Sequence, residues 1–268
     1  METDHESVSV LMKERIHKTL KEIEETYHVK ILFACESGSR GWGFASRDSD
    51  YDVRFIYVHK LDWYLTLDKK RDVIEKPIDD ELDVSGWELS KALKLMRNSN
   101  PALIEWLHSP IVYFKDKVFF AQLEQLAAQF YSPLKSRYHY LSISKRNLHT
   151  DFKGEQVRLK KYFYILRATL ALRWLELGKK MPPMAFSELV AATVNDKAVL
   201  DEINELLFFK SQANESQYGA RRPAIDRLIA ESIAKAELLQ LSEPNYRHSH
   251  LLDDFLFQTV LQSSTSTA

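Results

Sequence analysis

Residues 36–58 read ESGSRGWGFASRDSDYDVRFIYV, and this stretch is the most informative part of the chain. It combines a Gly-Ser turn, a short polar loop and two carboxylates, Asp50 and Asp52, at the head of an apolar run. The apolar runs at 29–34 and 53–58 predict two buried, partnered strands around the loop. Because side chains two apart in a strand share a face, the two carboxylates are expected on one face, about 7 Å apart at Cα. Such a pair can share two divalent cations about 3.5–4 Å apart, the separation used in two-metal phosphoryl chemistry.

The spacing of these residues resembles a known signature. Gly38-Ser39, ten intervening residues and Asp50-Tyr51-Asp52 resemble the signature of the DNA polymerase β-like nucleotidyltransferase superfamily. The fuller string from Glu36 to Phe44 resembles one bacterial subgroup, the predicted nucleotidyltransferases linked to RNA repair. The likeness extends over most of the chain, to Asn100-Pro101, Glu105-Trp106-Leu107, Ser109-Pro110 and Lys160-Lys161-Tyr162-Phe163-Tyr164.

Composition describes an ordinary globular protein of 268 residues, with 45% hydrophobic and 28% charged residues. No apolar run approaches the roughly 18 residues of a membrane span, and the N-terminus is acidic and polar, so neither a membrane partner nor a signal peptide is expected. A single cysteine excludes an internal disulfide framework and a Cys-rich zinc site. The expected compartment is the cytoplasm, and no oligomeric state is predicted.

Positive charge is concentrated in one segment. Residues 133–184 contain 12 Lys and Arg against 3 Asp and Glu, although the whole chain has a net charge of −1. Such a stripe is expected where a polyanion binds, and it is equally typical of a solvated helix face that offsets acidic neighbours. Whether the segment binds RNA or only a triphosphate stays open at this point.

The pattern along the chain predicts an α+β protein. A helix is expected within 6–27, two further strands within 72–86, and mostly helix after about residue 115. Asn100-Pro101 and Ser132-Pro133 have the pattern of helix N-caps followed by Pro at the first helical position. The resemblance implies a mixed, palm-like β-sheet nucleotidyltransferase domain followed by an all-helical domain. We therefore expect domains at 1–114 and 115–262, the second closing over the nucleotide, and a disordered tail at 263–268.

A third carboxylate is expected to complete the metal site. Asp83 lies between apolar Leu82 and Val84, which predicts a strand, and the resemblance places the family's third acidic position on this strand. The alternative is a surface carboxylate. The prediction is that Asp50, Asp52 and Asp83 are the catalytic and metal-binding residues for two Mg²⁺ or Mn²⁺ ions, with a nucleoside triphosphate as substrate.

The Gly-Ser turn is expected to bind the phosphates. Gly38 allows close approach of the backbone, the N–H groups of the turn donate to phosphate oxygens, and the Ser39 hydroxyl donates to the β or γ phosphate. Arg40 offers a guanidinium fork for phosphate oxygen, or is simply an exposed loop arginine. No P-loop sequence and no serine nucleophile elbow occur, so those two chemistries are not indicated.

A second group of residues is expected on the helix at 155–177. Lys160, Tyr164 and Arg167 follow one another at helical spacing, so they share a flank beside the apolar stripe. A Lys and an Arg around a Tyr can bind the triphosphate and stack on the nucleoside. The alternative is a solvated amphipathic flank. Lys161 points about 100° away from Lys160 around the helix.

Together these patterns predict a metal-dependent nucleotidyltransferase. It moves a nucleoside monophosphate from a nucleoside triphosphate to an acceptor hydroxyl and releases pyrophosphate, and the subgroup resemblance favours an RNA end as acceptor. AMP transfer to a protein or a small molecule would require the same loop and carboxylates. An alternative of another class is a nucleotide- or RNA-binding module without turnover.

Overall fold

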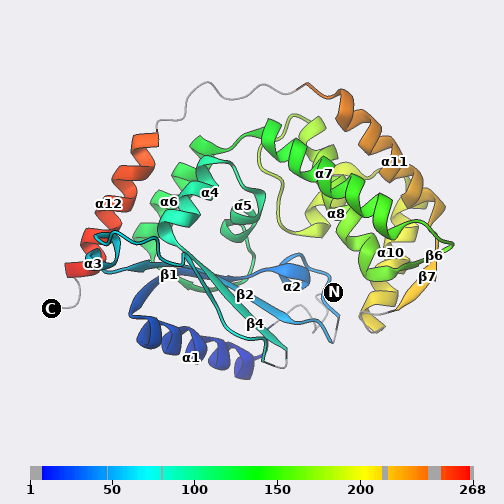
Figure 1. Ribbon diagram of the computed structural model, residues 1–268. Helices are drawn as coiled ribbons and strands as arrows, with labels where there is room; N and C mark the ends of the chain where they lie inside the picture. Colours follow the sequence, from blue (N-terminus) through cyan, green and yellow to red (C-terminus); the bar gives the residue numbers. More distant parts are fainter. Residues whose placement is uncertain (1–7, 47, 80, 213–216, 241–248, 266–268) are drawn as a thin grey trace. The chain divides into compact units, whose positions relative to one another are not determined.

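The computed structural model divides the chain into two compact units. The sheet unit comprises the described residues of Ser7–Gly41, Asp50–Tyr131 and Pro244–Ala268 (Figure 1). The helical unit comprises the described residues of Trp42–Ser49 and Ser132–Glu243. The structure describes residues 8–46, 48–79, 81–212, 217–240 and 249–265.

The sheet unit is built on a mixed sheet of five strands in the order β3-β4-β2-β1-β5. The strands are β1 (Val29–Glu36), β2 (Tyr51–His59), β3 (Val73–Glu75), β4 (Leu82–Glu88) and β5 (Val112–Lys115). The pairs β1–β2, β1–β5 and β3–β4 are antiparallel, whereas β2 and β4 are parallel. The predicted α+β class and its mixed sheet are confirmed.

Helices cover both faces of this sheet (Figure 1). The helix α1 (Val10–Tyr27) lies on one face and buries Met12, Ile16, Leu20 and Ile23 against it. The other face carries α4 (Leu89–Arg97), α5 (Pro101–Leu107), α6 (Lys117–Phe130) and α12 (Ser249–Thr265). The short helices α2 (Gly38–Gly41) and α3 (Leu61–Tyr64) follow β1 and β2.

The alternation of β2 fixes which side chains face which layer. Val53, Phe55 and Tyr57 pack in the apolar cluster with α1, while Ile56 and Val58 pack in the cluster under α4, α5, α6 and α12. Asp52 is an even number of residues from Ile56, so its side chain lies on the same face of the sheet as Ile56, the face covered by α4, α5, α6 and α12. It lies at the end of the strand, beyond the apolar cluster.

The helical unit is organised around α8 (Leu159–Glu176). This helix buries side chains on nearly all sides, among them Phe163, Leu166 and Leu170. Its neighbours are the helices α7 (Pro133–Asp151), α9 (Phe186–Thr193), α10 (Lys197–Gln212) and α11 (Pro223–Leu238). The unit also contains a small antiparallel sheet of β6 (Gln156–Arg158) and β7 (Tyr218–Ala220), two strands that are distant in sequence. Within the described residues, no helix has both the length and the apolar character needed to cross a bilayer.

Both predicted helix caps are present. The Asn100 side chain accepts hydrogen bonds from the N–H groups of Ala102 (3.0 Å) and Leu103 (3.3 Å), and the Ser132 hydroxyl accepts from that of Lys135 (3.2 Å). These contacts satisfy N–H groups that a helix leaves without an internal partner. The caps therefore begin α5 and α7 where the local sequence indicates.

The two compact units differ from the predicted domains, which were residues 1–114 and 115–262. The helices α6 and α12 belong to the sheet unit, because Phe119, Phe120, Leu252 and Phe255 share an apolar cluster with the strands. The strands β5, β6 and β7 are further departures from the expected pattern. The disordered tail predicted at 263–268 is wrong for 263–265, which lie in α12, and residues 266–268 lie outside the described residues.

Candidate active site at the head of strands β2 and β4

The Gly-Ser turn lies directly against the Asp52 carboxylate. Gly38 has φ +57°, a left-handed conformation that glycine adopts without steric cost. A Cβ added at Gly38 would lie only 1.9 Å from Asp52 Oδ2 and 2.7 Å from Asp52 Cγ. The Ser37 N–H also donates to the Asp52 carbonyl oxygen at 2.8 Å. Gly38 is therefore needed both for the backbone conformation and for the space that the carboxylate occupies.

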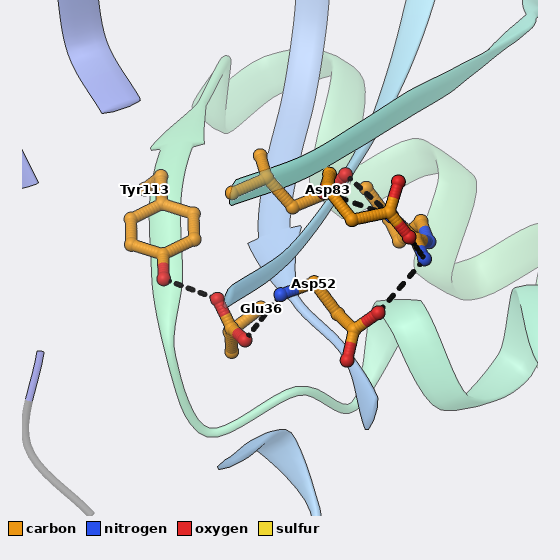
Figure 2. Close-up of polar contacts among 6 residues, drawn as sticks. Glu36, Asp52, Asp83 and Tyr113 are labelled. Atoms are coloured by element: carbon orange, nitrogen blue, oxygen red, sulfur yellow. Dashed lines mark hydrogen bonds and ion pairs between the residues drawn. The ribbon is translucent and has the colours of Figure 1, made fainter. Parts of the chain in front are cut away.

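Asp52 and Asp83 are brought together by the pairing of two parallel strands. Asp52 in β2 is the register partner of Asp83 in β4, so both side chains lie on the same face of the sheet. Figure 2 shows the two carboxylates turned toward a common cation. That cation is Arg54, whose Nη2 donates to Asp52 Oδ1 at 2.9 Å and to Asp83 Oδ2 at 2.7 Å.

A buried glutamate holds the backbone of Asp52 (Figure 2). Glu36 Oε1 accepts a hydrogen bond from the Asp52 N–H at 2.8 Å, and Glu36 Oε2 accepts one from the Tyr113 hydroxyl. Burial raises the pKa of Glu36 to about 7, against the opposing effect of its two hydrogen bonds. Burial and the neighbouring Glu36 charge also raise the pKa of the Tyr113 hydroxyl. Glu36 and Tyr113 thus anchor the strand end that presents Asp52.

The remaining predicted residues of the sheet unit have distinct environments. Asp50 lies immediately before β2 and is exposed, whereas Ser39 is buried in α2. The Arg40 guanidinium is also buried and lies 3.9 Å from the centre of the Tyr51 ring. Arg40 is therefore not the exposed loop arginine of the alternative interpretation.

No cluster of three His, Cys, Asp or Glu side chains suited to a metal ion occurs within the described residues. The structure brings Asp52 and Asp83 to one cation, Arg54, rather than assembling them with Asp50 into a compact triad. A positive charge between two carboxylates compensates the repulsion that they would otherwise feel.

The three predicted residues of α8 form one cluster with Trp42 of the signature loop, the segment Trp42–Ser49 that precedes β2. The Trp42 and Tyr164 rings meet edge to face at 5.3 Å, and the Arg167 guanidinium carbon lies 4.5 Å from the centre of the Trp42 ring. The Lys160 ammonium lies 6.0 Å from the centre of the Tyr164 ring. Lys161 instead pairs with Asp151 at 3.3 Å, in agreement with its predicted direction.

The signature loop itself packs within the helical unit. Phe44 is buried and stacks on Phe163 with ring centres 4.8 Å apart, so it anchors the loop. The loop also meets a buried lysine, Lys210, whose Nζ lies 3.5 Å from the Ser46 hydroxyl. The predicted carboxylates and the predicted α8 residues thus belong to the two different units, and the loop belongs to the helical one.

Four residues of these clusters were missed by sequence reasoning: Glu36, Arg54, Tyr113 and Lys210. Arg54 had a usable signal, because it follows Asp52 at strand period and therefore shares its face. Glu36 also had a signal, because a carboxylate at the end of a buried strand requires a hydrogen-bond partner. Tyr113 and Lys210 are remote in sequence and had no local signal.

Comparison with known proteins gives a match over most of the chain. The chain matches a family described as the RNA repair pathway DNA polymerase beta family over residues 12–258. It is 46% identical over 224 residues to the uncharacterized protein YcgL of Bacillus subtilis (strain 168), which covers 84% of this chain and 86% of that protein.

A solved structure is also similar, at lower level. The crystal structure of a nucleotidyltransferase-like protein from Exiguobacterium sibiricum 255-15 aligns with 92% of this chain and 80% of its own. The identity is 12% and the TM-score is 0.30.

Proposed function

Because this chain belongs to the RNA repair pathway DNA polymerase beta family, we propose that it is a metal-dependent nucleotidyltransferase. It transfers a nucleoside monophosphate from a nucleoside triphosphate to an acceptor hydroxyl and releases pyrophosphate. One observation carries the proposal: Asp52 and Asp83 are register partners on adjacent strands, and Gly38 lies against Asp52. A Gly-Ser turn beside paired carboxylates suits a triphosphate whose charge is neutralised by cations.

The donor chemistry fits magnesium or manganese, since these hard cations prefer carboxylate oxygens. The missing Cβ of Gly38 lets Asp52 Oδ2 face the turn where phosphates would lie. We assign Asp50, Asp52 and Asp83 as the residues that would hold two such ions. When bound, ions of this kind neutralise the triphosphate and lower the pKa of an acceptor hydroxyl.

The chain's own groups supply the positioning. In the proposed reaction the acceptor oxygen bonds to the α-phosphorus while the bond to pyrophosphate breaks, so the triphosphate must be held in line with the acceptor. The N–H groups at Gly38 and Ser39 and the Ser39 hydroxyl are the proposed donors to the phosphates. Arg40, stacked on Tyr51, adds a fixed positive charge to the same turn.

The cluster on α8 is the proposed second nucleotide-binding group. Lys160 and Arg167 provide positive charge for the triphosphate, and Tyr164 offers an aromatic ring to the nucleoside. The contacts of Trp42 with Tyr164 and Arg167 tie this cluster to the signature loop. That link supports a role in nucleotide binding over a solvated flank, because the fixed Arg167 is largely buried.

The end of an RNA strand is the proposed acceptor. The family is described by an RNA repair pathway, and residues 133–184 carry 12 basic against 3 acidic residues. AMP transfer to a protein or small molecule is the competing proposal within the same chemistry. A binding module without turnover is less well supported, since such a module has no need of paired carboxylates beside a phosphate-binding turn.

The test is incubation of the purified protein with each α-labelled nucleoside triphosphate and Mg²⁺ or Mn²⁺, with and without RNA. We expect pyrophosphate release and label on the RNA end. Label on the protein or on a small molecule would select the competing acceptor. No labelled product and no pyrophosphate under any of these conditions would refute the enzyme and leave the binding module.

Variants make this test specific for the carboxylates. The double variant Asp50→Asn and Asp52→Asn is expected to fold and to lose pyrophosphate release. Asp68→Asn, an exposed carboxylate in the loop between α3 and β3, is the control for removal of charge. Activity of the double variant at the level of this control would refute the assignment of the two carboxylates.

A further inference from the structure

Arg54 is the most firmly held charged group at the paired carboxylates. Besides its bonds to Asp52 Oδ1 (2.9 Å) and Asp83 Oδ2 (2.7 Å), its Nη1 donates to the carbonyl oxygens of Val53 (3.1 Å) and Asp83 (3.0 Å). Its side chain is 18% exposed. Four hydrogen bonds from one planar guanidinium fix its position between the two strands.

The position of Arg54 has an electrostatic consequence for cation binding. Asp52 and Asp83 are the carboxylates that carry the proposed metal site, and one guanidinium nitrogen already bonds to both. A divalent cation that enters the same site meets this positive charge a few ångströms away, and like charges at such distances repel even with partial screening. A metal bound to a triphosphate arrives in a complex whose net charge is negative, so the complex as a whole is not repelled by Arg54.

We propose that Arg54 is an internal counter-ion that occupies the Asp52–Asp83 pair until a metal–triphosphate arrives. It keeps both carboxylates in one orientation, with Asp52 Oδ2 against Gly38, and it opposes occupation of the site by a bare cation. Metal binding is thereby coupled to nucleotide binding. The inference rests on the proposed function, but its test requires no turnover.

Two other roles for Arg54 predict different results. If Arg54 only joins β2 to β4, its loss lowers stability and leaves the affinity for a bare cation unchanged. If Arg54 is required to shape the carboxylates for the cation, its loss weakens that affinity. Of the three roles, only that of a counter-ion predicts tighter binding of a bare cation when the positive charge of Arg54 is removed.

The experiment is a calorimetric titration of the full-length protein with Mn²⁺ in the absence of nucleotide. The variants are Arg54→Gln and Arg54→Met. Methionine keeps an unbranched apolar side chain, like the aliphatic part of arginine, without the positive charge. We expect both to bind Mn²⁺ at least tenfold more tightly than the wild type, and Arg54→Lys to stay within threefold of it. Arg15→Gln removes the same charge from the ion pair with Asp79 in the same unit (2.8 Å) and is the matched control, expected to stay within twofold.

The outcomes separate the proposals. Tighter Mn²⁺ binding in the folded variants, with the control unchanged, supports the counter-ion even if no nucleotidyl transfer is ever detected. Equal or weaker binding overturns it, even if the wild type proves to be an active enzyme. Should the neutral variants fail to fold by circular dichroism, the wild type and Arg54→Lys are titrated with and without a non-hydrolysable triphosphate. A gain in wild-type affinity of less than threefold with the triphosphate then overturns the proposal.

Discussion

Replacement of Gly38 by alanine tests whether the close approach of the turn to Asp52 matters. The change has two separable effects. The first is the cost of a side chain at φ +57°, about 1–2 kcal/mol. The second is steric: Asp52 Oδ2 must retreat from 1.9 Å to the 3.4 Å of an ordinary contact, a shift of about 1.5 Å. That shift is incompatible with the 2.9 Å bond between Asp52 Oδ1 and Arg54 as it stands.

Gly178 provides a control for the first effect alone. It has φ +68°, and a Cβ added there would have no atom within 4 Å. Gly178→Ala therefore carries the backbone cost without a clash. We expect both variants to lose about 1–2 kcal/mol of unfolding free energy, and Gly38→Ala up to about 1 kcal/mol more, since the Asp52 carboxylate can rotate away rather than unfold the turn.

The rate of pyrophosphate release is expected to differ between Gly38→Ala and Gly178→Ala. Because a misplacement of about 1 Å can cost about 100-fold in rate, Gly38→Ala should lose about that factor in pyrophosphate release, and Gly178→Ala should stay within about threefold of wild type. Unfolding free energies come from urea titration, and rates from a coupled pyrophosphate assay. Equal activity of the two variants would refute the reasoning that Gly38 makes room for a functional Asp52 carboxylate.

Three further perturbations follow from the structure. Burial raises the pKa of Glu36 from 4.5 to about 7, so the unfolding free energy that this group contributes is fully present below about pH 4.5 and falls by at most about 3 kcal/mol as the pH rises to about 7. Urea titrations at several pH values should show that Glu36→Gln makes the unfolding free energy fall less steeply with pH, and an unchanged fall would count against this reasoning. Lys160→Ala should raise the KM for the triphosphate at least tenfold, whereas Lys161→Ala, which loses only a partly exposed ion pair with Asp151, should change the KM less than twofold. Equal effects of the two substitutions would contradict the proposed nucleotide binding by the cluster on α8. Asn100→Ala should lower the unfolding free energy by about 1 kcal/mol in urea titration, because two capping bonds are lost, and no loss would show that the cap is dispensable.

Local sequence was sufficient for the elements whose signals lie within a few residues. The apolar runs around the Gly-Ser turn correctly predicted β1 and β2, and the pairs Asn100-Pro101 and Ser132-Pro133 predicted the starts of α5 and α7. Strand alternation predicted that Asp83 lies in a strand with its neighbours buried. These predictions succeed because caps, turns and alternation depend on the backbone conformation of adjacent residues.

Other features depended on pairing between distant segments. The register of β2 and β4 sets Asp83 beside Asp52, and the same register lets Arg54 reach both carboxylates. The short strand β5 was not predicted, yet it supplies Tyr113 to Glu36 from 77 residues away. Apart from the contact between Arg54 and Asp52, which lie two residues apart in β2, these contacts have no local signal, because the residues become neighbours only when the sheet assembles.

The chain by itself thus determined the turn, the spaced aspartates, the helix caps and the family resemblance, all of which are encoded within short stretches. Only the tertiary structure decided that a single arginine spans the carboxylate pair, that Arg40 is buried on Tyr51, and that α12 returns to the sheet unit. The physical reason is that burial and charge pairing are set by strand register and by the packing of helices far apart in sequence, where local propensity carries little information.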